Sequence, residues 1–354
     1  MKTPLWIDSI KQDKNILVVP HWDSDGISSA ALVTKYIKKF GEYKFRYAFP
    51  DIGTYNLIPK DFRKSGNIEL GKKDFDTLII VDYAVPGKDI LNFKNKYNIP
   101  VVVFDHHERE PVKGDNIFYY NPVAFDKKNK AYPSCTWVVK QELNLEISDL
   151  VIIGIAGDLE ERFLGWGFER FPQIKDYLEK NNRDYMDYVQ AKELIDIHYK
   201  ENDREILSSL VEKLIDMNGS PEKIMGKKDW IEKHKRHEQE MENILKQPPD
   251  KIMKDLLEVY FIDTDRNIIS AVTRRRAANT NANFVIVVNK GFFDGLSQIY
   301  VRRANDYGDD DTSFFKKEAS RLGASVGGKD DVAGIIIDNE KVAEYLKRVE
   351  RYDG

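Results

Sequence analysis

The sequence predicts an α/β protein whose N-terminal part contains a parallel sheet. Short, continuous runs of Val, Ile and Leu alternate with longer segments that have the apolar spacing of helices. Continuous apolar strands are typical of parallel sheets, because helices cover both faces of such sheets. A composition of 42% hydrophobic and 32% charged residues is that of a globular protein and excludes a disordered or collagenous chain.

The first elements have the order strand, loop, helix. Residues 15–20 (NILVVP) predict a strand, and the apolar spacing of residues 27–40 predicts the helix. Three more strands are predicted at residues 44–49, 77–81 and 101–104, with segments between them that are long enough to cross over as helices. An apolar helix is predicted over residues 149–157.

The character of the chain changes after this helix. Residues 160–250 are charged and favour helix, and the consecutive prolines in KQPPDK (246–251) end the helical sequence. Beyond them, strands are predicted at 259–263, 284–288 and 296–301, and helices at 312–322 and 340–351. We therefore expect an α/β domain over residues 1–165, a helical connection over 166–250 and a smaller α/β domain over 251–354.

Charge and cysteine content limit the classes of partner. The net charge of −4 creates no global basic field, so a polyanion would have to bind to local patches. No run of 18 apolar residues is present, and the N-terminus lacks the apolar core of a signal peptide, so we expect a cytoplasmic protein that does not bind membranes. Cys135 is the single cysteine and is expected to be a buried apolar residue in a reducing compartment.

Acidic and imidazole side chains follow three of the N-terminal strands. The first strand leads into HWDSDG (21–26), the strand at 77–81 is followed by Asp82, and the strand at 101–104 is followed by DHH (105–107). Parallel strands place such residues at one edge of the sheet, which is where open α/β sheets bind ligands. The crowded carboxylates would repel one another, and divalent ions would relieve this repulsion.

Each residue also has a structural explanation. Asp82 could be a turn residue before Pro86, Asp23 a helix N-cap, and the histidines of DHH a core residue and a solvated one. The succession of ligand-type residues at three strand ends favours a metal site. Because the site would combine carboxylate oxygens with imidazole nitrogens, Mn²⁺ fits best, with Mg²⁺, Co²⁺ and Zn²⁺ as alternatives.

The ordered motifs resemble those of the DHH phosphoesterases, and most closely the archaeal RecJ-type exonucleases. HWDSDG, VDYA around Asp82, DHH and GIAGDLEER around Asp158 occur in the order of the four family motifs. Asn121-Pro122 and Tyr132-Pro133 resemble shorter signatures between the third and fourth motifs. The H-x-D-x-D spacing of the first motif favours the RecJ-like branch over the pyrophosphatases and the short-oligonucleotide hydrolases.

The resemblance implies a two-ion centre and a role for each motif residue. It assigns His107, together with Asp82, to catalysis, with His107 in contact with the scissile phosphate. It implies that Asp82 bridges the ions. The implied metal ligands are His21, Asp23, Asp25, Asp82, His106 and Asp158. From the residues alone, Asp158 is only the polar end of an apolar helix.

Residues 323–329 of the C-terminal part read G-x-x-x-x-G-K, the opening of a Walker A motif. Asp330 replaces the Ser or Thr of that motif and a predicted helix precedes it, so we reject a P-loop. The segment instead resembles the glycine-rich motif of DHHA1 domains, which implies that Gly327, Gly328 and Lys329 bind substrate. Lys329 stands where relatives often have histidine.

Arginines provide the local positive charge that binding of a polyanion requires. Arg302, in QIYVRR, resembles a substrate-contacting arginine of the family. Arg274 and Arg276 belong to an arginine run that fits substrate contact and a solvated helix face about equally well.

We therefore expect a manganese-dependent, RecJ-like exonuclease that degrades single-stranded DNA or RNA to 5'-mononucleotides by two-metal hydrolysis. Its expected partners are single-stranded nucleic acid or short oligonucleotides, and a DNA replication or repair complex. One alternative is a hydrolase of short oligoribonucleotides, cyclic dinucleotides or a small phosphomonoester. A second alternative is a scaffold in a replication complex, which the intact set of ligand residues disfavours.

Overall fold

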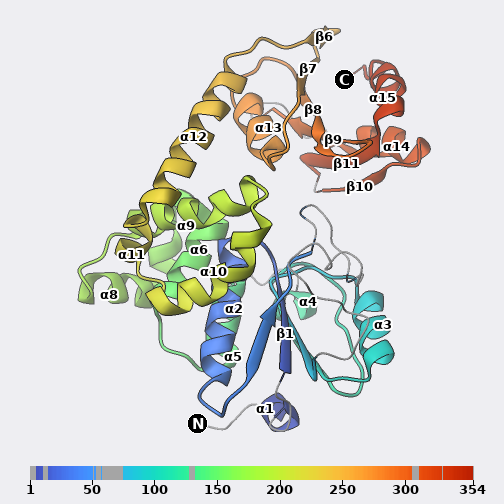
Figure 1. Cartoon of the computed structure of the whole chain (residues 1–354). Coiled ribbons are helices and arrows are strands. Elements are labelled where there is room, and N and C mark those ends of the chain that lie inside the picture. The colour runs from blue at the N-terminus through green and yellow to red at the C-terminus, as the bar shows by residue number, and fades with distance from the viewer. Residues whose placement is uncertain are drawn as a thin grey trace. The chain divides into compact units, whose positions relative to one another are not determined.

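A computed structural model describes residues 5–10, 15–50, 52, 57, 75–126, 132–304, 311–328 and 330–353. The chain forms two compact units. Unit 1 comprises Met1–Tyr199 and Asp203–His234, and unit 2 comprises Lys200–Asn202 and Lys235–Gly354. Each unit has its own sheet (Figure 1).

The sheet of unit 1 has five strands in the order β2-β1-β3-β4-β5, and every neighbouring pair is parallel. The strands are β1 (Asn15–Pro20), β2 (Lys44–Tyr47), β3 (Thr77–Val81), β4 (Val101–Phe104) and β5 (Ile117–Tyr120). All residues of the central strands β3 and β4 are buried, as expected for apolar strands covered on both faces. Because the strands are parallel, their carboxyl ends meet at one edge.

Helices cover the sheet of unit 1 on both faces. Figure 1 shows α2 and α5 on one side of the sheet and α3 on the other. Helix α2 packs against α5, α6 and α10, so it lies at the centre of a helical layer. The helices from α1 to α7 are α1 (Leu5–Ile10), α2 (Ser24–Ile37), α3 (Gly87–Tyr97), α4 (Pro122–Phe125), α5 (Cys135–Glu142), α6 (Asp149–Leu159), a 3-10 helix (Glu160–Gly165) and α7 (Gly167–Arg170).

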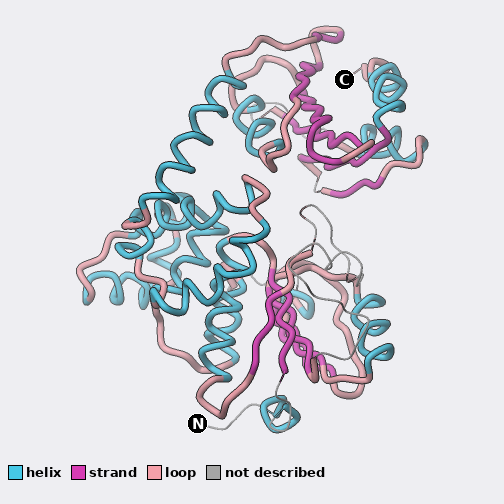
Figure 2. The backbone as a smooth tube through the Cα atoms, viewed as in Figure 1, coloured by secondary structure: helices cyan, strands magenta, loops and turns pink. Residues whose placement is uncertain are grey.

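The chain from α8 to α12 is helical, as Figure 2 shows. Its members are α8 (Pro172–Lys180), α9 (Tyr185–Lys200), α10 (Arg204–Met217), α11 (Pro221–Met225) and α12 (Lys228–Leu245). Helix α10 packs against α2 and β2, so much of this helical segment belongs to the core of unit 1. No described helix is long and apolar enough to span a membrane.

Unit 2 contains a mixed sheet in the order β10-β11-β9-β8-β7-β6. Only β7 and β8 run parallel, and the other neighbouring pairs are antiparallel. The elements are β6 (Lys251–Met253), β7 (Leu257–Ile262), α13 (Ile269–Ala277), β8 (Phe284–Phe293), β9 (Leu296–Arg303), α14 (Ser313–Arg321), β10 (Ser325–Gly327), β11 (Val332–Asp338), a 3-10 helix (Asn339–Lys341) and α15 (Val342–Val349).

Alternate residues of the strands in unit 2 supply two cores. Ile286 and Val288 of β8 pack with Phe315 of α14 and with α15. Val285 and Val287 point to the opposite face, where they pack with α13. The architecture as a whole confirms the predicted fold class, a parallel α/β domain, a helical region and a C-terminal α/β domain.

The element boundaries differ from the prediction in informative ways. Helix α2 begins at Ser24, three residues before the predicted start, because the Asp23 carboxylate accepts a hydrogen bond from the Gly26 N–H at 3.0 Å and caps the helix. Strands β5, β6, β10 and β11 go beyond the prediction. The residues of β5 are all half-buried, and β6 and β10 have only three residues each, so these three strands lack the continuous apolar pattern of a buried strand. In β11, buried residues alternate with half-buried ones.

Candidate metal centre

The carboxyl ends of three adjacent strands form one edge of the unit 1 sheet. Residues 21–25 follow β1, Asp82 follows β3 and residues 105–107 follow β4. The order β1-β3-β4 makes these three segments neighbours. As predicted, acidic and imidazole side chains lie together at this edge, because β1, β3 and β4 are adjacent strands.

Asp25 lies in the first turn of α2 and is completely buried. Its carboxylate accepts hydrogen bonds from the backbone N–H groups of Cys135, at 2.6 Å, and Thr136, at 3.0 Å. Both donors belong to the first turn of α5, whose N–H groups have no partner within the helix. The N-terminus of α5 therefore fixes the position of the Asp25 carboxylate.

Helix α6 brings Asp158 to the same place and passes very close to α2. A Cβ atom at Gly154 would lie 2.3 Å from Asp25 Oδ1 and 2.3 Å from Thr136 Oγ1. A Cβ atom at Gly157 would lie 2.5 Å from Ser24 Oγ. These two glycines, one helical turn apart, allow α6 to approach the loop after β1.

Asp82 has a left-handed backbone conformation with φ of 57°, which Asp and Asn adopt more readily than most other residues. Its N–H donates to the carbonyl of Phe104 at 2.9 Å, so the pairing of β3 with β4 continues through this residue. The side chain is buried, with 1% exposure.

The imidazoles lie around the two oxygens of Asp82. His106 Nε2 lies 3.3 Å from Asp82 Oδ1 and 3.1 Å from Asp158 Oδ2. On the other side, His21 Nδ1 lies 3.9 Å from Asp82 Oδ2 and 2.7 Å from Asp23 Oδ2.

Three overlapping groups of potential ligands result. Their members are Asp82, His106 and His107; His21, Asp23 and Asp82; and Asp25, His106 and Asp158. Within each group the ligand atoms lie within 4.8 Å of one another. Three buried atoms, Asp82 Oδ1, His106 Nε2 and Asp158 Oδ2, form no hydrogen bond with any described residue. A donor set of carboxylate oxygens and imidazole nitrogens fits a divalent ion.

The sequence of this region matches a family model. The model of the DHH family, N-terminal domain, matches residues 15–155. Residues 15–155 therefore have the sequence of a DHH-family N-terminal domain. The resemblance noted from the motifs is thereby confirmed for the DHH domain, while the RecJ-type branch stays a prediction. No curated protein matches the chain.

Solved structures similar to the chain include two RecJ proteins. An exonuclease RecJ bound to manganese has a TM-score of 0.68 and 16% identity, over 99% of this chain and 93% of that chain. RecJ from Thermus thermophilus in complex with Mn²⁺ has a TM-score of 0.67 and 17% identity, over 98% of this chain and 53% of that chain. This chain therefore spans about half the length of the Thermus protein, which has also been solved with Mg²⁺.

A third similar structure is a DHH domain from a member of a family of ribosomal proteins. It has a TM-score of 0.66 and 16% identity, over 99% of this chain and 90% of that chain. At these identities the three structures show a shared fold.

Burial, together with repulsion between neighbouring carboxylates, raises the pKa values of most acidic side chains in this cluster. Burial raises the pKa of Asp82 well above its usual range, and the nearby carboxylates of Asp25 and Asp23 raise it further. Burial likewise raises the pKa of Asp25. Burial raises the pKa of Asp158 to about 7, although His106 opposes the shift. Divalent cations would reverse these shifts, because positive charge favours the ionised carboxylates.

Asp23 behaves differently from the other carboxylates. Burial raises its pKa, but the contact with His21 lowers it by more, to about 2. Asp23 therefore stays ionised, and it combines its role as the α2 N-cap with a position in the ligand cluster. The role of Asp23 as an N-cap is therefore compatible with its predicted role as a metal ligand, which stays a prediction.

His107 is the most exposed imidazole of the centre and is held by Asp105. Its Nδ1 lies 2.7 Å from Asp105 Oδ1, and 3.9 Å from Asp82 Oδ1. Burial lowers the pKa of His107, but Asp105 raises it by more, to about 9. Asn121 donates to Asp105 Oδ2 at 3.3 Å and to the His107 carbonyl at 2.8 Å. His107 is therefore a cation at neutral pH.

We expect Asp105→Asn to shift the alkaline limb of the pH–rate profile to lower pH. Without the Asp105 charge, burial is left to lower the pKa of His107 from about 9. The variant should then lose roughly 10- to 100-fold in kcat/KM at pH 8.5 and much less at pH 6, because a charge that stabilises the transition state is lost only above the new pKa. Steady-state kinetics between pH 5.5 and 9.5 measure the shift.

The same pair makes stability depend on pH. The folded-state pKa of His107 is raised above 6.5, so the stabilisation is complete below that pH and is lost as pH rises through about 9. Asp105→Asn should remove this part of the pH dependence in chemical denaturation. If the alkaline limb of the pH–rate profile lies at the same pH in the variant as in the parent, the proposed role of Asp105 is contradicted.

Two of the arginines predicted to bind substrate in unit 2, Arg302 and Arg276, differ in their contacts. Arg302 lies on β9, 3.5 Å from Asp331 Oδ2, and its buried Nε atom has no hydrogen-bond partner among the described residues. Burial lowers the pKa of Arg302; Asp331 raises it and the nearby charge of Arg274 lowers it further. Arg276 contacts the ring of Tyr260, 4.0 Å from the ring centroid.

Part of the glycine-rich segment is a strand. Gly327 ends β10 and pairs with Gly334 of β11. Gly328 has φ of 111°, and a Cβ atom there would lie 2.2 Å from the carbonyl oxygen of Val332. Glycine at this position is thus required by the backbone. Lys329 lies outside the described residues.

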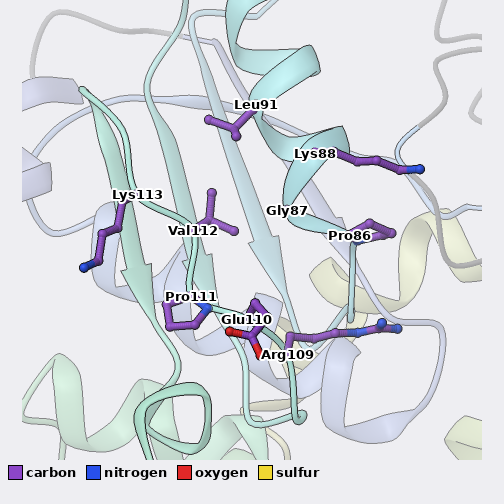
Figure 3. A pocket seen from close by; sticks show the side chains of 9 residues that line it. All are labelled: Pro86, Gly87, Lys88, Leu91, Arg109, Glu110, Pro111, Val112 and Lys113. Carbon is purple, nitrogen blue, oxygen red and sulfur yellow. The ribbon is translucent and has the colours of Figure 1, made fainter.

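A groove of about 450 Å³ lies beside the start of α3 (Figure 3). Its lining comes from residues 86–88, Leu91 and residues 109–113, which follow Asp82 and His107 in the chain. Lys88, Arg109 and Lys113 provide three positive charges, against the single negative charge of Glu110. The groove is therefore positively charged overall.

Several positioning residues are not recognisable from motif chemistry. Gly154, Gly157, and the N–H groups of Cys135 and Thr136 hold Asp25 and Asp158 in place through backbone geometry. The only sequence signal is the pair of glycines three residues apart in an apolar helix (GIAG). Such a pair predicts close helix packing but does not identify the neighbouring segment.

Proposed function

We propose that the protein is a metal-dependent, RecJ-like exonuclease that trims single-stranded nucleic acid from one end and releases 5'-mononucleotides. The observation that carries this proposal is the environment of Asp82. One of its oxygens lies 3.3 Å from His106 Nε2 and the other lies 3.9 Å from His21 Nδ1. A carboxylate that faces two ligand groups is suited to bridge two ions, as in two-metal phosphoesterases.

The residues divide into two ligand sets, and Asp82 lies beside both. It is grouped with His21 and Asp23, and its Oδ1 lies 3.3 Å from His106 of the other set. His21 and Asp23 would hold one ion, and Asp25, His106 and Asp158 the other. Bound ions would supply activation of water and neutralisation of phosphate charge. The mixed nitrogen and oxygen donors favour Mn²⁺ over Mg²⁺, which prefers oxygen.

His107 has the properties of a phosphate contact. Its side chain is 44% exposed, and one ring nitrogen, Nδ1, is held by Asp105. With a pKa of about 9 it carries a proton and a positive charge at neutral pH. It can therefore donate a hydrogen bond to a phosphate oxygen and stabilise negative charge that develops there.

Two basic regions support a nucleic acid substrate. The groove beside α3 is lined by Lys88, Arg109 and Lys113. Its lining residues come a few positions after Asp82 and His107 in the chain. In unit 2, Arg302 lies close enough to Arg274 for the two positive charges to interact unfavourably, which an anion would relieve. Several separate cations favour a substrate with several phosphates over a phosphomonoester.

We expect hydrolysis to rise with substrate length up to roughly ten nucleotides, because each added phosphate can meet another cation. Purified protein with Mn²⁺ would be incubated with 5'- or 3'-labelled single strands of DNA and RNA, from dinucleotides to long oligonucleotides. The first labelled product identifies the end that is attacked, and gel or chromatographic analysis shows whether mononucleotides are released. A matched duplex tests the preference for single strands.

The length series also separates the rival functions. A maximum at two to five nucleotides, or activity on cyclic dinucleotides or a phosphomonoester alone, would replace the exonuclease proposal by the corresponding hydrolase. Absence of hydrolysis and of Mn²⁺ binding in calorimetry would favour the scaffold alternative. Arg302→Gln serves as a control, since it should raise the KM for long strands about 10-fold and leave the ligand cluster of unit 1 intact.

A further inference from the structure

Helix α9 joins two segments that carry metal ligands. It contributes Lys192 and Asp196, which are each 3% exposed and one helical turn apart. Charged residues are rarely buried unless they are paired, and each of these two has a partner outside α9. Helix α9 also lies outside the segment that the DHH family model matches.

Asp196 holds the loop after β1. Its Oδ1 accepts a hydrogen bond from the backbone N–H of Ser24 at 2.8 Å, in a buried position. Ser24 is the first residue of α2 and lies between Asp23 and Asp25. The N–H groups of a first helical turn have no partner within the helix, and Asp23 already caps that of Gly26. Asp196 thus acts as a second cap from a distant part of the chain.

Lys192 connects this cap to the end of α6. Its Nζ lies 3.6 Å from Asp196 Oδ2 and 3.2 Å from Glu160 Oε1. Glu160 lies two residues after Asp158 and has a left-handed φ of 51° where α6 ends. The Lys192 ammonium group therefore links two residues. Asp196 holds the segment that carries Asp23 and Asp25, and Glu160 ends the helix that carries Asp158.

The two segments also contact each other directly. The missing side chain of Gly157 allows α6 to approach Ser24, so Ser24 lies between α6 and Asp196 of α9. Movement of α9 would shift Asp23 and Asp25 through Ser24, and Asp158 through Glu160. The segment that carries Asp23 and Asp25 and the helix that carries Asp158 thus share one support.

We propose that the buried Lys192–Asp196 pair is a positioning element that sets the separation of Asp23, Asp25 and Asp158 for metal binding. This inference rests on the proposed metal-dependent function. Outer-shell partners of metal ligands typically contribute about 10- to 100-fold in metal affinity. Neither residue of the pair belongs to the groups of candidate metal ligands among the described residues.

Mn²⁺ affinity of the full chain, measured by calorimetry with the metal alone, tests the pair. Asp196→Ala removes both the acceptor for the Ser24 N–H and one of the carboxylate partners of Lys192, and we expect Mn²⁺ to bind about 10- to 100-fold more weakly. Asp196→Asn keeps an oxygen acceptor and should lose less. Lys192→Met should weaken binding as well, and Lys192→Arg, which keeps the charge, should restore most of it.

Asp149→Asn is the matched control for loss of a buried carboxylate. Asp149 begins α6 at the end opposite Asp158, and it accepts hydrogen bonds from Tyr177 at 2.8 Å and from Tyr188 of α9 at 2.6 Å. It therefore joins the same two helices away from the ligands. Its loss should lower the Tm measured in EDTA but leave the Mn²⁺ affinity within about twofold of the parent.

The outcomes are distinct. If Asp196→Ala folds and binds Mn²⁺ as tightly as the parent, the inference is overturned. It is also overturned if Asp149→Asn has the same Tm as Asp196→Ala and loses as much Mn²⁺ affinity. If Asp196→Ala does not fold, the comparison of Lys192→Met with Lys192→Arg decides, and equal affinities in these two would overturn the inference. A parent that binds Mn²⁺ but hydrolyses no nucleic acid contradicts the proposed function only. A parent that binds no Mn²⁺ contradicts both.

Discussion

Asp82→Asn is expected to abolish hydrolysis and leave the fold intact. Asp82 belongs to the group with His21 and Asp23, and its Oδ1 lies 3.3 Å from His106 of the other site, so its loss affects both candidate ion sites. An amide is a much weaker ligand than a carboxylate, and it cannot supply the negative charge that a bridging position requires. We expect kcat/KM to fall by about 100-fold or more, since even outer-shell partners contribute about 10- to 100-fold.

The fold should survive because Asn suits this position. Asn has the shape of Asp and adopts the left-handed conformation that Asp82 has, with φ of 57°. Burial and the charges of Asp25 and Asp23 raise the pKa of Asp82. A raised carboxyl pKa destabilises the metal-free fold increasingly as pH rises from about 4 towards the folded-state pKa. Asn removes this penalty.

Thermal unfolding in EDTA at pH 8 checks the prediction. The variant should have a Tm equal to or above that of the parent. Added Mn²⁺ should raise the Tm of the parent, because a ligand that binds only the folded state stabilises it, and should have much less effect on the variant. Retained hydrolysis would rule out the bridging role, and a lower Tm in EDTA would assign the lost activity to damage to the fold.

Gly154→Ala is expected to disrupt metal binding from a position that is not a ligand. The new Cβ would lie 2.3 Å from both Asp25 Oδ1 and Thr136 Oγ1, far inside van der Waals contact. Asp25 is completely buried and is held by two backbone N–H groups of α5, so it cannot move without losing these bonds. Overpacking of this kind costs about 1–3 kcal/mol, and the higher helix propensity of Ala offsets about 1 kcal/mol of that.

The expected result is a lower free energy of unfolding, together with Mn²⁺ affinity reduced by about 10-fold or more. Chemical denaturation in EDTA measures the first effect, and calorimetry with Mn²⁺ measures the second. Gly165→Ala is the control, because a Cβ atom at Gly165 meets no described atom within 4 Å. Unchanged stability and metal affinity in Gly154→Ala would mean that α6 can move away from α2 at little cost.

Much of the metal centre could be predicted because parallel strands end together. Once residues 15–20, 77–81 and 101–104 are identified as buried parallel strands, the residues after them must share one sheet edge. That reasoning finds the residues of HWDSDG, VDYA and DHH. It does not find Asp158, which a helix brings to the site, and only the family resemblance indicated that residue.

The supporting residues could not be predicted in the same way. Asp196 accepts a hydrogen bond from the N–H of Ser24, which is 172 positions away in the chain. Nothing in the sequence of α9 distinguishes this aspartate from a solvated one. Likewise, the glycines of α6 indicate close packing with an unspecified neighbour. In unit 2, part of the glycine-rich segment, Ser325–Gly327, is a strand that pairs with β11, and the local sequence did not predict this strand.

The fold class, the strand ends and the chemical type of the candidate ligands could therefore be predicted from the amino-acid sequence. Local apolar patterns specify strands and helices, and a parallel sheet then places the residues after each strand at a common edge. Only the tertiary structure decided which oxygen of Asp82 faces which histidine, how α5 and α6 hold Asp25, and how Lys192 and Asp196 connect the two ligand segments. Such contacts depend on helix packing distances of a few ångströms, which are set by the whole core and leave no pattern in the local sequence.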